Sequence, residues 1–184
     1  MDSASSVERA RAECRRQLPE LLPRLGRFAI GLTRARYDAD DLVQAACERA
    51  LSRSDQWDPE TALDSWMFRI VQTIWLNELR ARKIRERHAD REQADRIGTR
   101  RESSDARLLL LRTEEEIFRL PDGLRLVLLL VGVQGLSYRE AADVLSIPIG
   151  TVMSRLARAR LLLTERLGFD PDSAPQNTEL LNGI

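Results

Sequence analysis

The chain has 184 residues, 43% of them hydrophobic, and its 29 basic and 29 acidic side chains give a formal net charge of zero. This length allows one domain or two small ones with buried cores, and neutrality means that any DNA contact must come from local basic patches. Cys14 and Cys47 lie far apart and His88 is the single histidine, so the composition predicts free thiols in a reducing cytoplasm, no metal site, no cofactor and no enzyme.

Nothing in the apolar pattern indicates a membrane protein. Residues 1–12 are polar, lack the apolar core of a signal peptide and are predicted to fray. The longest apolar run, residues 126–133, is too short to cross a bilayer, which predicts no membrane insertion. Because strand signals are also nearly absent, we expect an all-α protein.

A first helix is predicted over residues 13–36. Apolar residues recur in it with a period near 3.6, which is typical of a helix with one buried face. Pro19 and Pro23 interrupt the pattern, and they favour a continuous helix that begins only near these two positions.

A second helix is predicted to begin at Asp38, whose side chain can cap its first turn. The acidic residues Asp40 and Asp41 suit the positive end of the helix dipole. Residues 53–61 then read as a loop that contains Trp57. In such a polar loop, the Trp57 side chain either packs into the core or serves a function at the surface.

A third helix with a basic end is predicted over residues 62–87. Its apolar stripe includes Trp66 and Ile70, and Phe68 and Trp75 are expected to add aromatic surface. Aromatic residues beside arginines suit single-stranded DNA, since bases stack on the rings and phosphates contact the cations. The alternative is a core helix whose basic C-terminal end interacts favourably with the negative end of the helix dipole, which explains the same pattern.

A charged segment separates this helix from the C-terminal part of the chain. Residues 88–107 show almost no apolar periodicity, which predicts a linker between two small helical domains, residues 13–87 and 108–168. A solvated helix is the alternative for the first half of this segment. Residues 169–184 are polar and turn-rich, and they are predicted to form a mobile tail.

Two helices begin the second domain, at residues 108–120 and 124–133. A turn at residues 121–123 joins them, and Gly135 suits the C-terminal end of the second. A pair of shorter helices follows. Ser137 and Glu140 have the spacing of a capping box, and Pro148 breaks the chain before the last helix.

The last of these helices has an apolar face and a basic face. Between Ile149 and Arg160 it carries three arginines and no acid. Arginines that bind guanine edges and hydroxyls that bind phosphates suit a helix in the major groove. A surface helical hairpin with a solvated basic face is the simpler alternative. The residues predicted on the basic face are Thr151, Ser154, Arg155 and Arg158.

The sequence LPDGLRLVLLLVGVQGLSYREAADVLSIPIGTVMSRLARAR resembles region 4 of the extracytoplasmic-function (ECF) sigma factors, small bacterial subunits of RNA polymerase. The resemblance implies that this domain contacts the polymerase β flap and reads the −35 promoter element as duplex DNA. Met153 stands where family members often carry lysine or arginine. The residues implied to contact the −35 element are Thr151, Met153, Ser154, Arg155 and Arg158.

Two N-terminal stretches resemble region 2 of the same family. The sequence DLVQ at residues 41–44 is similar to a helix that packs on the polymerase β′ clamp helices, and it implies polymerase contacts by Asp40, Asp41, Val43 and Gln44. The sequence SWMFRI at residues 65–70 is similar to the part that reads the −10 element. The residues implied to melt and hold that element are Trp57, Ser65, Trp66, Arg69, Gln72, Arg80 and Lys83.

The resemblance implies a sigma factor that binds core RNA polymerase, recognises promoter DNA in transcription initiation during a stress response, and is controlled by an anti-sigma factor. Catalysis would then belong to the polymerase. Two other functions fit part of the pattern. One is a stand-alone helix-turn-helix regulator that binds duplex DNA as a dimer. The other is a sigma-like module that sequesters an anti-sigma factor.

Overall fold

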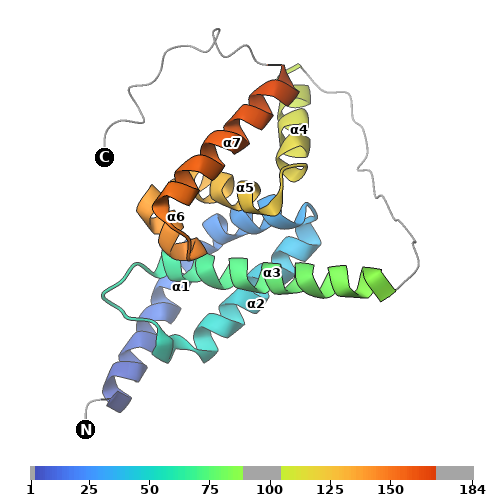
Figure 1. The fold of residues 1–184 in the computed structure, drawn as a ribbon. Coiled ribbons are helices and arrows are strands. Elements are labelled where there is room, and N and C mark those ends of the chain that lie inside the picture. The colour runs from blue at the N-terminus through green and yellow to red at the C-terminus, as the bar shows by residue number, and fades with distance from the viewer. Residues whose placement is uncertain (1–2, 89–104, 169–184) are drawn as a thin grey trace.

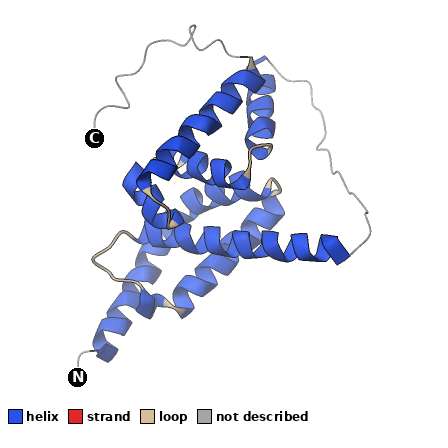
Figure 2. Ribbon diagram, in the orientation of Figure 1, coloured by secondary structure: helices blue, strands red, loops and turns tan. Residues whose placement is uncertain are grey.

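The computed structural model describes residues 3–88 and 105–168, and within these ranges it contains helices and no strands (Figures 1 and 2). The all-α prediction is confirmed. The N-terminal half contains α1 (Ser3–Thr33), α2 (Arg36–Ser52), the short 3-10 helix η1 (Ser54–Gln56) and α3 (Leu63–His88). The C-terminal half contains α4 (Asp105–Phe118), α5 (Asp122–Val127), the π-helical segment η2 (Leu128–Val133), α6 (Tyr138–Leu145) and α7 (Ile149–Leu167).

Helix α1 is longer than the sequence pattern predicts. The expected fraying is wrong for residues 3–12, and so is the helix start near the prolines, because α1 begins at Ser3 and runs through Pro19 and Pro23; residues 1–2 lie outside the described residues. Both prolines are exposed, so water can bond the carbonyls that lose their helical partners. Upstream of them, Ala10 and Cys14 are buried, and this burial favours continuing the helix.

The junction between α1 and α2 is a single tight turn. Arg34 adopts a left-handed conformation with φ 71°, so α2 begins at Arg36 with Ala35 at its N-cap. The prediction that Asp38 caps this helix is therefore wrong, since Asp38 lies in its first turn. There its charge still faces the positive end of the helix dipole.

Helix α3 buries a different stripe from the one predicted. Phe68 and Trp75 were expected at the surface, but both are buried, together with Met67 and Val71. The Phe68 ring meets the Phe28 ring of α1 edge to face, with centroids 5.2 Å apart. The helix has two adjacent apolar stripes because it packs against α1 and α2 on one side and against the C-terminal half on another.

The C-terminal half differs from its predicted elements at α5. The predicted turn at residues 121–123 is instead the helix start, because the Leu124 and Arg125 amides both donate to the Pro121 carbonyl. The predicted helix 124–133 then widens into η2, where the Gln134 amide donates to the Leu129 carbonyl at 2.9 Å. Gly135 follows with φ 74°, as its predicted role at the helix end requires.

The predicted helix-turn-helix is present as α6 and α7. The Ser137 amide donates to Glu140 Oε2 at 2.7 Å and the Glu140 amide donates to Ser137 Oγ at 3.3 Å, so the capping box is confirmed. Ser146 turns the chain in a left-handed conformation, and Pro148 is the N-cap of α7.

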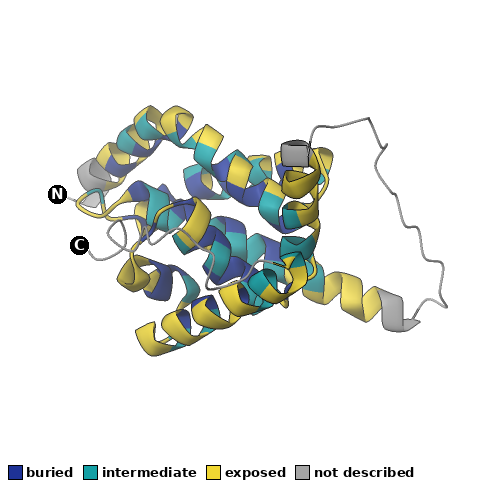
Figure 3. Cartoon of the chain, turned by 90° about the horizontal axis from the view of Figure 1, so that it is seen from above, coloured by how far each residue is buried: buried dark blue, intermediate teal, exposed yellow. Residues whose placement is uncertain are grey.

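Much of the predicted linker, residues 89–104, and the predicted tail, residues 169–184, lie outside the described residues, whereas residues 105–107 already belong to α4. The two halves pack against each other, with α3 beside α6 and α1 beside α4 and η2 (Figure 1). Buried residues lie mostly where the helices face one another, and exposed residues lie mostly on the outer faces (Figure 3). None of the described helices is long and apolar enough to cross a membrane.

Candidate nucleic-acid interface

Helix α7 presents most of its predicted DNA-reading residues to solvent. Its apolar face buries Val152, Leu156 and Ala159 against the rest of the C-terminal half. The opposite side leaves Met153, Ser154 and Arg158 exposed and Thr151 half-buried. The Ser154 hydroxyl donates to the Thr151 carbonyl at 3.2 Å.

Arg155 is less accessible than Arg158. It is half-buried, and its guanidinium lies against the first turn of α5, where a Cβ added at Gly123 would be 3.3 Å from Arg155 Nη1. The absence of a side chain at Gly123 leaves room for this contact. Arg158 is therefore the arginine of the predicted set that is better placed to enter a groove.

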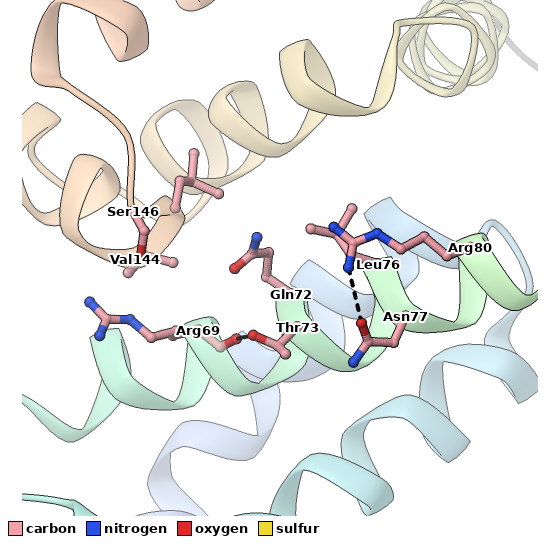
Figure 4. A pocket seen from close by; sticks show the side chains of 9 residues that line it. Arg69, Gln72, Thr73, Leu76, Asn77, Arg80, Val144 and Ser146 are labelled. Atoms are coloured by element: carbon pink, nitrogen blue, oxygen red, sulfur yellow. Dashed lines mark hydrogen bonds between the residues drawn. The ribbon is translucent and has the colours of Figure 1, made fainter.

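Four of the predicted −10 residues of α3 lie on the side of the helix nearest the C-terminal half, where Gln72 is half-buried and Arg69, Arg80 and Lys83 are exposed. Arg69, Gln72 and Arg80 line one side of a cavity of about 260 Å³, and Val144 of α6 and Ser146, which follows α6, line the other side (Figure 4). The Arg69 guanidinium donates a hydrogen bond to the Asp143 carbonyl, and Arg80 Nη1 donates to Asn77 Oδ1 at 3.2 Å. Further along α3, Lys83 Nζ lies 3.8 Å from a carboxylate oxygen of Asp122.

Trp57 and Trp66 form a stacked pair at the beginning of α3. Their ring centroids are 6.3 Å apart and the planes differ by 26°. Trp57 is 4% exposed and Trp66 is half-buried, so Trp57 fills the core in this conformation, as the structural interpretation of the loop predicts. Trp57 Nε1 has no hydrogen-bond partner among the described residues. Ser65 is half-buried beside this pair, and its amide donates to Asp64 Oδ1 at 2.7 Å.

The predicted polymerase-contacting residues form an open surface on α2. Asp40, Asp41 and Gln44 are exposed, and Gln44 Nε2 donates to Glu48 Oε1 at 3.0 Å along the same face. Val43 is half-buried and packs against the core. The predicted residues therefore occupy three separate surfaces, on α2, on α3 and on α7.

Four residues at the contact between the halves were not singled out by the sequence interpretation. Arg24 Nη2 of α1 donates to the Gln134 carbonyl at 3.1 Å, and Gly31 lies against Leu129. Arg34 lies 5.3 Å from the centroid of Phe118. A glycine inside a helical pattern is a weak signal of close packing, but no sequence signal identifies Arg24 or Arg34.

Arg125 is the fourth of these residues and the most buried arginine of the contact. It is 8% exposed, with its guanidinium 5.3 Å from the Trp75 ring and 5.7 Å from the Phe118 ring. Burial lowers the pKa of the Arg125 guanidinium, Asp122 raises it, and nearby Arg34 lowers it further. Arg125 and Arg34 therefore each lie over an aromatic ring where the two halves meet.

The described residues show no cluster of three or more histidine, cysteine, aspartate or glutamate side chains that could hold a metal ion. Cys14 is buried and Cys47 half-buried, and both are free thiols. Burial raises the pKa of each thiol.

The chemistry that the three surfaces offer is recognition, through exposed acids on α2, arginines and an amide on α3, and hydroxyls and arginines on α7.

Comparison with known proteins identifies both halves. Residues 110–163 match the family Sigma-70, region 4, and residues 18–72 match the Sigma2 domain of PhyR. The chain is 33% identical over 159 residues to the ECF RNA polymerase sigma factor EcfG of Rhodopseudomonas palustris, covering 85% of this chain and 87% of EcfG. It is 34% identical over 134 residues to the ECF RNA polymerase sigma-E factor of Escherichia coli K12, covering 67% and 70% of the two chains.

A solved structure supports the same assignment. The sigma factor RpoE of Bartonella quintana, in complex with the anti-sigma factor NepR, superposes with a TM-score of 0.71 at 29% identity. The match covers 85% of this chain and 97% of RpoE. The helix-turn-helix with its exposed basic face, the N-terminal helices and these relatives lead to one conclusion. The chain belongs to the extracytoplasmic-function family of RNA polymerase sigma factors.

Proposed function

We propose that this sigma factor binds core RNA polymerase through the exposed surface of α2 and directs it to promoters whose −35 element is read by α7. The observation that carries this proposal is the exposed face of α7, on which Ser154 and Arg158 face solvent while Val152 and Leu156 fix the helix to its domain. A helix held in this way presents one rigid polar face to a groove.

The −10 element is assigned to the N-terminal half. Residues 13–87 form the domain that holds the melted strand, residues 108–168 form the domain that reads duplex DNA, and residues 88–107 connect them. Arg69, Gln72, Arg80 and Lys83 follow one another along α3 and suit a strand that tracks the helix. The protein acts in the cytoplasm with the polymerase, and the polymerase supplies the catalysis.

We further infer that an anti-sigma factor controls this protein. The support comes from RpoE, which was solved in complex with the anti-sigma factor NepR and matches most of this chain. RpoE and this chain share a similar arrangement of helices, so a partner of the same kind has a comparable surface to bind.

Run-off transcription tests the proposal. Core polymerase, this protein and linear promoter-region fragments from the source genome are mixed, and the transcripts are sequenced. Transcripts with fixed start sites that require the protein support the proposed function. If the protein neither comigrates with the core enzyme nor yields such transcripts, the proposal is wrong.

A matched pair of variants on α7 tests the −35 assignment. Arg158 and Arg160 are both exposed on the same helix, but only Arg158 belongs to the predicted reading face. Arg158→Ala is expected to reduce discrimination between promoter and random duplex by about 1–3 kcal/mol if Arg158 binds a guanine edge. Arg160→Ala removes the same charge and is expected to leave that discrimination unchanged.

A second pair tests polymerase binding by α2. Asp41 and Asp55 are both exposed acids of the N-terminal half, and only Asp41 lies on the proposed surface. Asp41→Asn should weaken comigration with core polymerase, and Asp55→Asn should not. Equal behaviour of the two variants would place the polymerase contact elsewhere.

A sigma-like module that sequesters an anti-sigma factor is the second candidate function. The observation that favours it is the match of residues 18–72 to the Sigma2 domain of PhyR. Such a module has no need of a reading face on α7, so it predicts anti-sigma binding without transcripts and without any effect of Arg158→Ala on DNA.

A further inference from the structure

A stripe of exposed apolar side chains runs along α7. Ile149, Met153 and Ala157 follow one another at intervals of four residues, which places them on one side of the helix. All three are exposed, with 47% of Ile149 and 52% of Met153 accessible to solvent. Different apolar residues, Val152 and Leu156, attach α7 to its domain and are buried. The apolar stripe formed by Ile149, Met153 and Ala157 is therefore not part of the core.

A polar stripe lies directly beside the apolar stripe. Gly150, Ser154 and Arg158 each follow one member of the apolar stripe in the sequence, and all three are exposed. Neighbouring residues are separated by about 100° around a helix axis, so the two stripes share the solvent-facing half of α7. Ser154 and Arg158 are proposed above to read the −35 element. A groove that receives them also receives the apolar stripe.

The charge around the apolar stripe favours DNA as its partner. Between Ile149 and Arg160, α7 carries three arginines and no acid. No ion pair between described residues engages any of these arginines, so their charge is available to phosphates. Ile149 and Met153 also lie near the N-terminal end of α7, which is the end that contacts base edges in a helix-turn-helix.

The major groove offers one apolar group to such a stripe. Thymine presents its C5 methyl group there, whereas the base edges otherwise present hydrogen-bond donors and acceptors. Apolar side chains recognise thymine by contact with this methyl group. Met153 suits the contact because its long, flexible thioether side chain adapts to an irregular surface.

We propose that the apolar stripe of α7 packs on thymine methyl groups of the −35 element, and that Met153 determines this preference. The inference rests on the proposed reading of the −35 element by α7. It places A·T pairs next to the base pair that Arg158 contacts. Met153 thus contributes to sequence recognition by contact with a base, although it has no charge and no hydrogen-bond donor.

Replacing thymine with deoxyuridine tests the contact, because the two bases differ only in the C5 methyl group and keep the same hydrogen-bonding edge. The full chain, alone or assembled with core polymerase, first selects duplexes from a pool of random sequence. Thymines of the selected duplex are then replaced one at a time. Fluorescence anisotropy measures Kd for each labelled duplex at fixed ionic strength.

The wild type is expected to bind about fourfold more weakly when the contacted methyl group is removed, which is the effect of exposing one buried methyl group. Met153→Ala is expected to bind the thymine and deoxyuridine duplexes equally. Leu161→Ala is the matched control, because Leu161 is 55% exposed on the same helix but lies about two turns closer to its C-terminal end. This control should keep the fourfold difference of the wild type.

A second variant at the same position gives an independent readout. Met153→Lys replaces the apolar end of the side chain with a cation, so it should lose the preference for thymine and steepen the salt dependence of binding by about one counterion. Because Met153 is exposed, neither variant disturbs the core. A fourfold difference that persists in both variants would show that the methyl group is not read by Met153.

The apolar stripe could instead contact a protein. In that case deoxyuridine has no effect on the wild type at any selected thymine, while Met153→Ala weakens comigration with core polymerase. This result, or a selected duplex without thymine in the −35 element, overturns the inference.

The same experiments separate this inference from the proposed function. If a duplex is selected and its binding depends on Arg158 but not on any thymine methyl group, only the inference is wrong. If binding depends on the methyl group through Met153 but no transcripts form with core polymerase, the inference stands and the sigma function is wrong. If the protein selects no duplex in either form, the −35 assignment and the inference are both wrong.

Discussion

Replacing Arg125 with alanine should destabilise the folded protein far more than replacing a surface arginine. Arg125 Nη1 donates to the Phe118 carbonyl at 3.1 Å and Nη2 to Asp122 Oδ1 at 2.8 Å. Its guanidinium also covers the rings of Trp75 and Phe118. The side chain therefore connects α4, the start of α5 and α3.

The size of the effect follows from these contacts. A buried hydrogen bond to a charged group contributes about 1.5–3 kcal/mol, and each cation–π contact contributes about 0.5–2 kcal/mol. The Asp122 pair adds little, because that carboxylate is 37% exposed. Alanine also relieves the burial of the charge and of the unpaired Nε, so we expect a net loss of about 2–4 kcal/mol.

Urea denaturation followed by far-UV circular dichroism measures this loss. The control is Arg119→Ala, which removes the ion pairs of the exposed Arg119 with Glu115 and Glu116 and should cost less than about 1 kcal/mol. A double-mutant cycle with Trp75→Leu isolates the contact across the halves, with an expected coupling of about 0.5–2 kcal/mol. Equal losses for Arg125→Ala and Arg119→Ala would refute the reasoning.

Three further predictions concern the core, the helix-turn-helix and the thiols. Phe28→Ala should cost about 3–5 kcal/mol in a urea titration, since Phe28 is fully buried against Phe68; a loss below about 1 kcal/mol would contradict the packing. Ser137→Ala should lower the free energy of unfolding by about 1 kcal/mol in a thermal melt, because it removes the cap of α6. Ser137→Thr keeps a capping hydroxyl and should retain most of that stability. Alkylation of Cys47 by iodoacetamide at pH 8 should be slower than that of a solvent-exposed cysteine in a short peptide, because a raised pKa leaves less thiolate, and its rate should go on rising with pH beyond the range in which the peptide thiol levels off. A normal rate at pH 8 would show that Cys47 is accessible and unperturbed.

Local rules predicted the C-terminal motif well. The capping box at Ser137 and the left-handed Gly135 depend on a few neighbouring residues, so the sequence contains all the information they need. The apolar face of α7 follows from its period for the same reason. The residue assignments on α2, α3 and α7 remain predictions, and the variants of Asp41 and Arg158 proposed above test those on α2 and α7.

The features that the sequence did not reveal depend on distant partners. Pro19 and Pro23 break helices locally, but burial of Ala10 and Cys14 outweighs that cost in α1. Trp75 lies near basic residues in the sequence, a pattern typical of a surface aromatic residue. It is buried because Arg125, fifty positions later, covers it. The contact at Gly31 likewise depends on how the two halves are placed together, which no local pattern encodes.

The positions of the tryptophans make the two halves optically distinguishable. The chain has three, at positions 57, 66 and 75, and all lie in the N-terminal half. Trp57 and Trp66 stack on each other, whereas Trp75 meets Arg125 of the other half. Tryptophan emission therefore originates in the N-terminal half, and a Phe substitution at Trp57 and Trp66 would leave a single tryptophan, Trp75, whose spectrum reports on its contact with Arg125 without any attached dye.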